Sequence, residues 1–243
     1  MVNLWVFVTT TFVLAGVVKG VTGMGLPTVS MGVLGLLMAP AEAASLLIIP
    51  SLITNVWQFA AGPNRLPLFR RTWPMLLAIA IATWAGAGLL SAGSGAITAL
   101  GVALIVYAIV GLAKLRIAVP SRAEPWLSPL IGAATGVVTG ATGVFVIPAV
   151  PYLQALGLDK DDLVQALGLS FTISTIALAV GLASHGAFHV SAGSASLLCT
   201  VPAIAGMQLG QWVRNRVDPM GFRLLFFIGL LLLGADLAAR SLT

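Results

Sequence analysis

The chain has 243 residues, of which 59% are hydrophobic and only 8% are charged, and its mean hydropathy is +1.06. A soluble domain carries roughly a quarter of its residues as charged side chains, so this composition excludes a soluble globular protein. It predicts a multi-pass protein of the cell membrane, with the inner membrane of a bacterium as the expected location and the lipid bilayer as its surroundings. The net charge of +5 does not indicate a nucleic-acid partner, because the basic residues lie in short loops between apolar segments, where membrane orientation explains them.

Eight apolar segments follow one another along the chain, and two of them are too long for one straight span. A span needs roughly 20 residues, whereas the first segment covers about residues 3–38 and the fifth about residues 126–158. Glycines followed by Pro27 and Pro148 predict a break inside each long segment, since glycine exposes backbone and proline removes a hydrogen-bond donor. The remaining helices are expected at about residues 41–61, 72–92, 96–115, 161–184, 191–213 and 219–239.

The two long segments carry the same motif. Residues 16–23 read GVVKGVTG and residues 136–143 read GVVTGATG, so six of the eight positions are identical. Recurrence of this kind indicates an internal repeat. We therefore expect one all-α membrane domain made of two homologous four-segment repeats, residues 1–122 and 123–243. Each repeat would contain a Gly-rich broken or re-entrant helix followed by about three transmembrane helices.

The positions of lysine and arginine distinguish two topologies. If each long segment crosses the membrane once, seven basic residues lie on one side and four on the other. If each long segment is a hairpin that enters and returns on the same side, ten lie on one side and Arg240 alone on the other. Short cytoplasmic loops collect lysine and arginine, so this distribution favours the hairpins over broken single crossings. The two repeats would then be inverted, and the tips of their hairpins would meet near the membrane midplane. Transporters built from inverted repeats hold their substrates there.

Lys19 is the only lysine or arginine deep inside an apolar segment, and its counterpart in the second repeat is the neutral Thr139. A cation at mid-bilayer costs at least about 2.5–3.5 kcal/mol on insertion scales, so it needs a partner. Because the long apolar segments contain no acidic residue, we expect that partner to be a small anionic substrate. The alternative is that Lys19 pairs with backbone carbonyls beside the break or extends toward the membrane surface. A lysine kept from water also makes proton coupling a candidate mechanism.

The Gly-rich motif has two interpretations. Residues 16–20 and 136–140 form GxxxG patterns, which are typical of packed membrane helices. Alternatively, the helical arm after each break presents N–H groups and a positive dipole end to an anion, while glycines let the anion approach and threonines add hydroxyl donors. Breaks at corresponding positions of two repeats favour the binding site. The candidate substrate-binding residues are Thr22, Gly23, Gly25, Thr142 and Gly143, to which the repeat adds Thr139.

A stripe of polar side chains lies on the helix after each broken segment. Ser51, Asn55 and Gln58 have i, i+4, i+7 spacing, and Ser170 and Ser174 occupy the matching region of the second repeat. Such side chains either line a substrate site or only join helices, at about 0.6 kcal/mol per hydrogen bond. We include Asn55, Gln58, Ser170 and Ser174 among the candidate substrate-binding residues.

No cofactor, metal or catalytic residue is predicted. His185 and His189 have i,i+4 spacing, but no acidic or cysteine ligand lies nearby, and zinc needs three or four ligands. The chain also lacks an HExxH motif and a nucleophile elbow, so we do not expect an enzyme.

At its two glycine motifs the chain resembles the sulfite exporter TauE/SafE family of membrane transporters. The signatures are residues 16–27 and 136–148, and the second carries Phe145 where the first has Gly25. The resemblance extends over nearly the whole chain. It implies transport, in the direction of export, of sulfur-containing anions such as sulfite, sulfoacetate and other organosulfonates.

Residues and resemblance together predict a secondary transporter that moves a small sulfur-containing anion by alternating access. Lys19 would supply the charge, the two breaks the donors, and Asn55 and Ser174 lateral contacts. An anion channel on the same site and a membrane scaffold or assembly protein without a substrate are the alternatives. A homodimer is compatible with the sequence.

Overall fold

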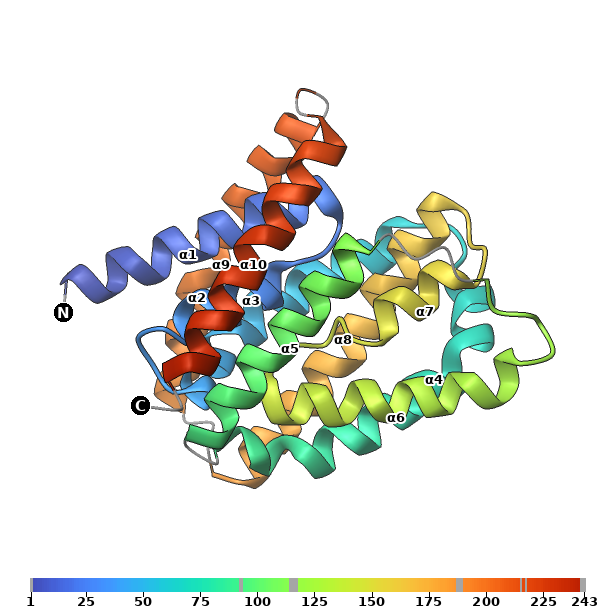
Figure 1. The fold of residues 1–243 in the computed structure, drawn as a ribbon, viewed down its shortest axis with the longest axis horizontal. Helices are drawn as coiled ribbons and strands as arrows, with labels where there is room; N and C mark the ends of the chain where they lie inside the picture. The colour runs from blue at the N-terminus through green and yellow to red at the C-terminus, as the bar shows by residue number, and fades with distance from the viewer. Residues whose placement is uncertain are drawn as a thin grey trace.

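The computed structural model describes residues 2–91, 94–113, 118–186, 190–214, 216 and 218–240. All regular structure in these residues is helical (Figure 1). The first half contains α1 (Val2–Thr22), α2 (Leu26–Leu34), α3 (Pro40–Ala61), α4 (Arg65–Gly86), a 3-10 turn η1 (Ala87–Ser91) and α5 (Ser94–Leu112). The second half contains α6 (Glu124–Thr142), α7 (Ala149–Ala155), α8 (Lys160–Ser184), α9 (Val190–Arg214) and α10 (Pro219–Arg240).

The predicted helices are present, with one displaced start. The helix expected from about residue 72 begins at Arg65, because Arg65, Arg70 and Arg71 belong to its first two turns. Such residues can keep their charged ends at the membrane surface while their stems remain helical. The C-terminal limit expected for the fourth segment, at residue 115, lies outside the described residues, as do Lys114 and Arg116.

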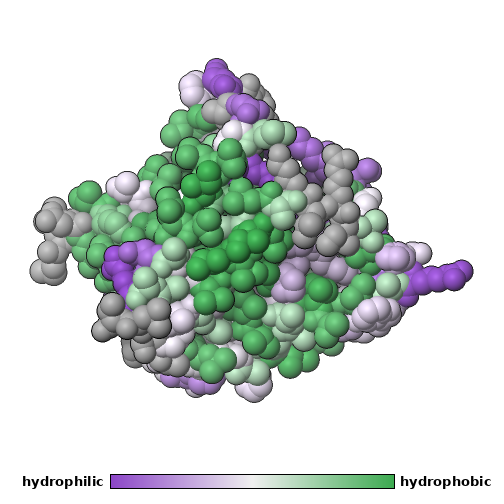
Figure 2. Space-filling model, in the orientation of Figure 1, coloured by the Kyte–Doolittle hydropathy of each residue, from purple (hydrophilic) through white to green (hydrophobic). Residues whose placement is uncertain are grey.

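Six helices of the described chain are long and apolar enough to cross a membrane. They are α1, α3, α4, α5, α8 and α10, and the protein is therefore a multi-pass membrane protein. Figure 2 shows apolar side chains over most of one face, with hydrophilic side chains gathered at its margins. Large apolar side chains such as Trp57, Val201 and Leu225 are exposed, which lipid explains and water would not.

The chain breaks where the glycine motifs predict a change of direction. α1 ends at Thr22, and positive φ angles at Gly23 (79°) and Gly25 (106°) lead into α2. α6 ends at Thr142, and Gly143 has a φ of 70°. These left-handed conformations favour glycine because other residues meet steric strain there. In Figure 1 the chain turns back at each break, so that α2 and α7 run roughly opposite to α1 and α6.

Each half packs its first helix against the third segment of the other half, α1 against α9 and α6 against α4. A Cβ atom added to Gly16 would lie 2.2 Å from the Ala203 carbonyl oxygen, and one added to Gly206 would lie 2.2 Å from that of Val13. At Gly140 a Cβ atom would lie 2.6 Å from the carbonyl carbon of Gly86. The GxxxG patterns of both repeats therefore bring helices into backbone contact, as the packing interpretation predicted.

Arg71 of α4 joins both arms of the second broken segment. Its Nε and Nη2 atoms donate to the Glu124 carboxylate, at 2.7 and 2.9 Å, at the start of α6. Nη2 also donates to the Leu156 carbonyl, 3.2 Å away, just after α7. The start of α6 and the end of α7 therefore lie at the same end of the bundle.

We expect Arg71→Gln to lower the free energy of unfolding by about 1 kcal/mol. A partly exposed ion pair contributes about 0.2–1 kcal/mol, and the hydrogen bond to the Leu156 carbonyl adds a similar amount. Thermal unfolding in detergent would measure the change, with Arg70→Gln as the matched control because Arg70 is an exposed neighbour on the same helix. Equal melting temperatures for the two variants would contradict this role of Arg71.

Candidate anion site beside the broken helices

Lys19 is buried inside the membrane domain, with 3% of its surface exposed. It lies in the last turn of α1, and its Nζ donates to the Asn55 side-chain oxygen and to the Thr54 hydroxyl, 3.1 Å away, both on α3. Within the described residues, the only ion pairs are Arg71–Glu124 and Arg240–Asp236, so no carboxylate pairs with Lys19. Its direct partners are neutral side chains rather than the backbone carbonyls that one interpretation predicted. The structure thus brings together two of the predicted site residues, Lys19 and Asn55.

Asn55 links Lys19 to the second half of the protein. The Asn55 amide donates to the Ser51 hydroxyl, 3.0 Å away, and the Thr175 hydroxyl of α8 lies 3.4 Å from that same oxygen. Asn55 and Ser51 are fully buried. The predicted stripe on α3 therefore forms a polar path between α1 and α8.

Ser170 and Ser174 are fully buried on α8, and their hydroxyl oxygens make no hydrogen bond within the described chain. Leaving a buried polar group unpaired costs about 1–3 kcal/mol. A ligand or a water molecule that meets these hydroxyls would remove that cost, so both remain candidates for substrate contact.

The threonines at the two breaks hold the local backbone. The Thr22 hydroxyl lies 2.9 Å from the Val18 carbonyl and 2.6 Å from that of Met24, and it accepts from the Met24 N–H at 3.2 Å. The Thr142 hydroxyl bonds to the Val138 carbonyl at 2.6 Å and accepts from the Val144 N–H at 3.1 Å. The same pattern of hydrogen bonds stabilises the backbone at each break. In this conformation both threonine hydroxyls therefore donate to backbone carbonyls of the protein.

Three other predicted residues also have protein partners. The Thr139 hydroxyl donates to the Thr135 carbonyl at 2.7 Å, and the Gln58 amide donates to the Val164 carbonyl at 2.8 Å. A Cβ atom on Gly143 would meet the Met31 side chain of α2 at 2.7 Å. Within the described residues, no hydrogen bond joins Lys19 to Thr139, Gln58 or Gly143.

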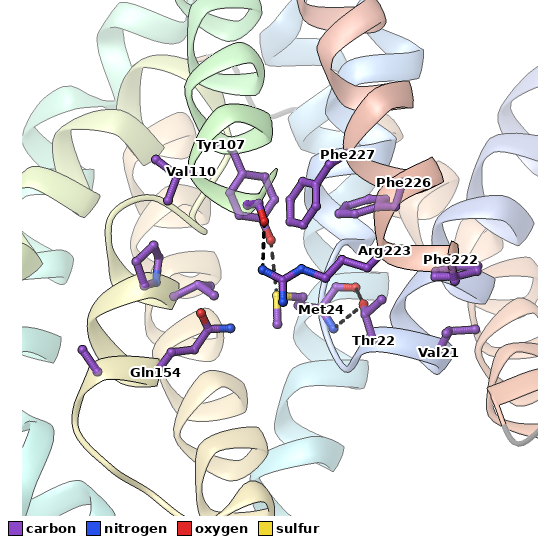
Figure 3. A pocket seen from close by; sticks show the side chains of 14 residues that line it. Val21, Thr22, Met24, Tyr107, Val110, Gln154, Phe222, Arg223, Phe226 and Phe227 are labelled. Atoms are coloured by element: carbon purple, nitrogen blue, oxygen red, sulfur yellow. Dashed lines mark hydrogen bonds between the residues drawn. The ribbon is translucent and has the colours of Figure 1, made fainter. Parts of the chain in front are cut away.

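A cavity of about 510 Å³ opens beside the first break, between α5, α7 and α10. Thr22 and Met24 line it from the break, and Gln154 lines it from α7. Arg223 of α10 reaches into the space between Tyr107, Met24 and Gln154 (Figure 3). The cavity therefore places a cation next to the predicted Gly-rich break.

Sequence reasoning missed Arg223, Tyr107 and Gln154. In the sequence, Arg223 is only one of the basic residues between apolar segments whose distribution indicates orientation. A signal was available, because Phe226 and Phe227 follow it at i+3 and i+4 and so lie on its face of the helix. Gln154 carries no pattern of its own, since the helix that contains it has only seven residues.

Of the two histidines at i,i+4 spacing, only His185 lies in the described chain. The His185 ring Nδ1 lies 2.8 Å from the Gly181 carbonyl oxygen, and His189 lies outside the described residues. No group of three His, Cys, Asp or Glu side chains comes together among the residues that the structure describes.

The family model of the sulfite exporter TauE/SafE matches residues 8–237, nearly the whole chain. The chain belongs to the TauE/SafE family. No curated protein and no solved structure matches it significantly. The match contains both glycine signatures, α1 from Val8 onward, and most of α10.

Membership in the TauE/SafE family confirms the resemblance found in the sequence and supports a membrane transporter of sulfur anions. The two glycine signatures of this protein differ in their surroundings. Gly25 lies at the break beside the cavity, whereas Phe145 is buried against the Phe171 ring, with centroids 5.4 Å apart. The first break therefore borders open space, and an aromatic contact fills the space beside the second.

Proposed function

We propose that this TauE/SafE protein is a secondary transporter of small sulfur-containing anions such as sulfite or an organosulfonate. The observation that carries the proposal is Lys19, a cation buried among neutral partners in a membrane-spanning helix. A buried charge is costly unless it is paired. An anion that reaches Lys19 would supply the missing charge, and it would do so at the end of α1, one turn before the break.

The substrate would bind the Lys19 ammonium group alongside Asn55 and Thr54. An ammonium has three donors, and two are taken by Asn55 and Thr54. The third is available to an oxyanion without breaking the existing contacts. The unpaired hydroxyls of Ser170 and Ser174 on α8 are candidates for the opposite side of the bound anion, together with the Gly-rich backbone at Thr22–Gly23 and Thr142–Gly143.

Several contacts support inverted repeats with re-entrant broken segments. Arg71 joins the start of α6 to the end of α7, as a hairpin that enters and returns at one end requires. Arg240, the last residue of α10, donates to the Leu36 carbonyl just after α2, 3.2 Å away. The chain just after α7 is therefore held by Arg71 of α4, and the chain just after α2 by Arg240 of α10. We assign one hairpin to each side of the membrane.

The difference between the two breaks supports alternating access. In this conformation the first break faces a cavity toward α7, whereas the second break contacts Met31 of α2. Exchange of these two packings would close the cavity and open an equivalent one beside the second break. Two discrete packings of related halves are the usual basis of this transport mechanism.

We expect Asn55→Asp to lower anion affinity at least tenfold while leaving the fold intact. The new carboxylate would occupy the position of the Asn55 oxygen that accepts from Lys19, so it would neutralise the cation that the substrate needs. Opposite charges at contact distance interact by about 4 kcal/mol in an effective protein dielectric near 20, and the substrate must compete with that pairing.

Uptake of labelled sulfite and sulfoacetate into proteoliposomes would test the proposal, with melting curves as the control for folding. Saturable uptake by the wild type, reduced in Asn55→Asp at an unchanged or higher melting temperature, is the expected result. Uptake by Asn55→Asp equal to that of wild type would overturn the assignment of Lys19. Ion conductance without saturation would favour the channel alternative, and absence of any transport would favour the scaffold.

A further inference from the structure

The cavity beside the first break has an aromatic wall. Tyr107 of α5 packs edge-on against Phe227 of α10, with ring centroids 5.2 Å apart and an interplanar angle of 78°. Phe226 and Phe227 pack against each other at 5.1 Å, and Phe222 extends this wall along α10. Aromatic rings offer apolar contact area without flexible chains. This wall suits the apolar body of a ligand.

Among the described residues that line the cavity, Arg223 is the only one with a charged side chain. Its Nη2 donates to the Gly111 carbonyl, 2.8 Å away, and the guanidinium carbon lies 5.6 Å from the centre of the Phe227 ring. A guanidinium group has five N–H donors, and this is its one hydrogen bond in the described part of the chain. The remaining donors and the exposed amide of Gln154 face the same space (Figure 3).

We propose that this cavity binds an amphiphilic anion, with its headgroup at Arg223 and its apolar body against Tyr107, Phe226 and Phe227. A planar guanidinium recognises an oxyanion in two-point contact. A volume of about 510 Å³ falls within the range of roughly 300–1,000 Å³ that accommodates whole organic ligands, and a four- or five-atom inorganic oxyanion would leave most of it empty. The cavity therefore fits an anion that carries an apolar chain or ring better than it fits sulfite.

This site is separate from the Lys19–Asn55 cluster. Lys19 does not line the cavity, and its contacts are on α3. Arg223 lies in the second turn of α10 and is exposed, so a ligand can reach it without entering the protein core. The inference therefore goes beyond the proposed transport function and stands even if Lys19 has no substrate.

Calorimetric binding of methane-, propane- and butanesulfonate to the protein in zwitterionic nanodiscs would test this site. Burial of one methylene group strengthens binding by about 0.8 kcal/mol, so we expect affinity to rise about fourfold per added methylene. Arg223→Gln should lower butanesulfonate affinity by about tenfold or more, since a hydrogen bond to a charged group is lost. Arg70→Gln removes the same charge from an exposed position outside the cavity and should leave binding unchanged.

Two results would overturn the proposal: affinity that does not depend on chain length, or equal butanesulfonate affinities for Arg223→Gln and Arg70→Gln. Lys19→Met separates this site from transport, because butanesulfonate binding should persist in that variant whether or not sulfite uptake is lost. A membrane lipid with an anionic headgroup shares the chemistry of an alkylsulfonate. Weaker butanesulfonate binding in nanodiscs containing phosphatidylglycerol would identify a lipid as the occupant, and unchanged binding would identify a water-soluble anion; either result supports Arg223 as the anion contact.

Discussion

Replacing Lys19 with methionine is expected to reduce sulfite or sulfoacetate uptake at least about thirtyfold while the protein remains folded. Losing a buried charged contact to a ligand costs about 2–5 kcal/mol, and 2 kcal/mol corresponds to a factor of about 30. The methionine side chain keeps an unbranched apolar stem but has no charge. Uptake into proteoliposomes and sulfite-dependent thermal stabilisation would both measure the effect, and a ligand at a hundred times its Kd should stabilise wild type by about 2.7 kcal/mol.

The melting temperature without ligand is the internal control for Lys19→Met. Removing an unpaired cation from a buried position relieves a desolvation cost, whereas Asn55 loses a hydrogen-bond partner, at about 1–3 kcal/mol. These effects oppose each other, so we expect a change of only a few degrees. Normal uptake by a folded Lys19→Met protein would disprove the role proposed for Lys19 and would favour a scaffold in which only the glycine contacts matter.

Gly16→Ala is expected to destabilise the protein by about 1–3 kcal/mol, the usual range for an overpacked interface. Its new Cβ atom would lie 2.2 Å from the Ala203 carbonyl oxygen and 2.9 Å from the Met207 nitrogen. Both are backbone atoms of α9, so α1 and α9 would have to move apart. The change would be seen as a lower melting temperature in detergent and a smaller yield of folded protein.

Gly229→Ala is the matched control because it makes the same substitution in α10, where a Cβ atom would meet nothing within 4 Å. Alanine is favoured over glycine in a helix by up to about 1 kcal/mol, so this variant should be as stable as wild type or more so. The two substitutions are thus expected to change the stability of the protein in opposite directions. If Gly16→Ala also left stability unchanged, the close contact between α1 and α9 would not be required for the fold.

The helical breaks illustrate what local sequence can predict. Gly23, Gly25 and Gly143 adopt left-handed backbone conformations, and glycine is the residue that tolerates them without a steric cost. Thr22 and Thr142 bond to nearby backbone in the same way. These features depend on residues within a few positions of one another, so a repeated motif was sufficient to locate both breaks. The sequence did not indicate that the threonine hydroxyls would be occupied by the backbone.

The packing of the GxxxG patterns was predicted as one of two interpretations, and the structure supports it through Gly16, Gly140 and Gly206. The partner helices could not be predicted. A glycine marks a face on which a backbone can approach closely, but it does not specify which of the other helices will occupy that face. The structure pairs α1 with α9 and α4 with α6, each pair joining segments far apart in the chain.

By itself, the sequence determined that the protein is an all-helical membrane protein, that the chain breaks at the glycines of a motif that occurs twice, and that one lysine lies in an apolar segment. Composition and local motifs carry that information. Only the tertiary structure decided that Asn55 and Thr54 hold Lys19, and that Arg223, Tyr107 and Gln154 meet at a cavity beside the first break. The physical reason is that a helix in lipid is apolar on every face, so the periodicity that identifies the inward face of a soluble helix is weak, and the rotation of each helix is set by packing against its neighbours.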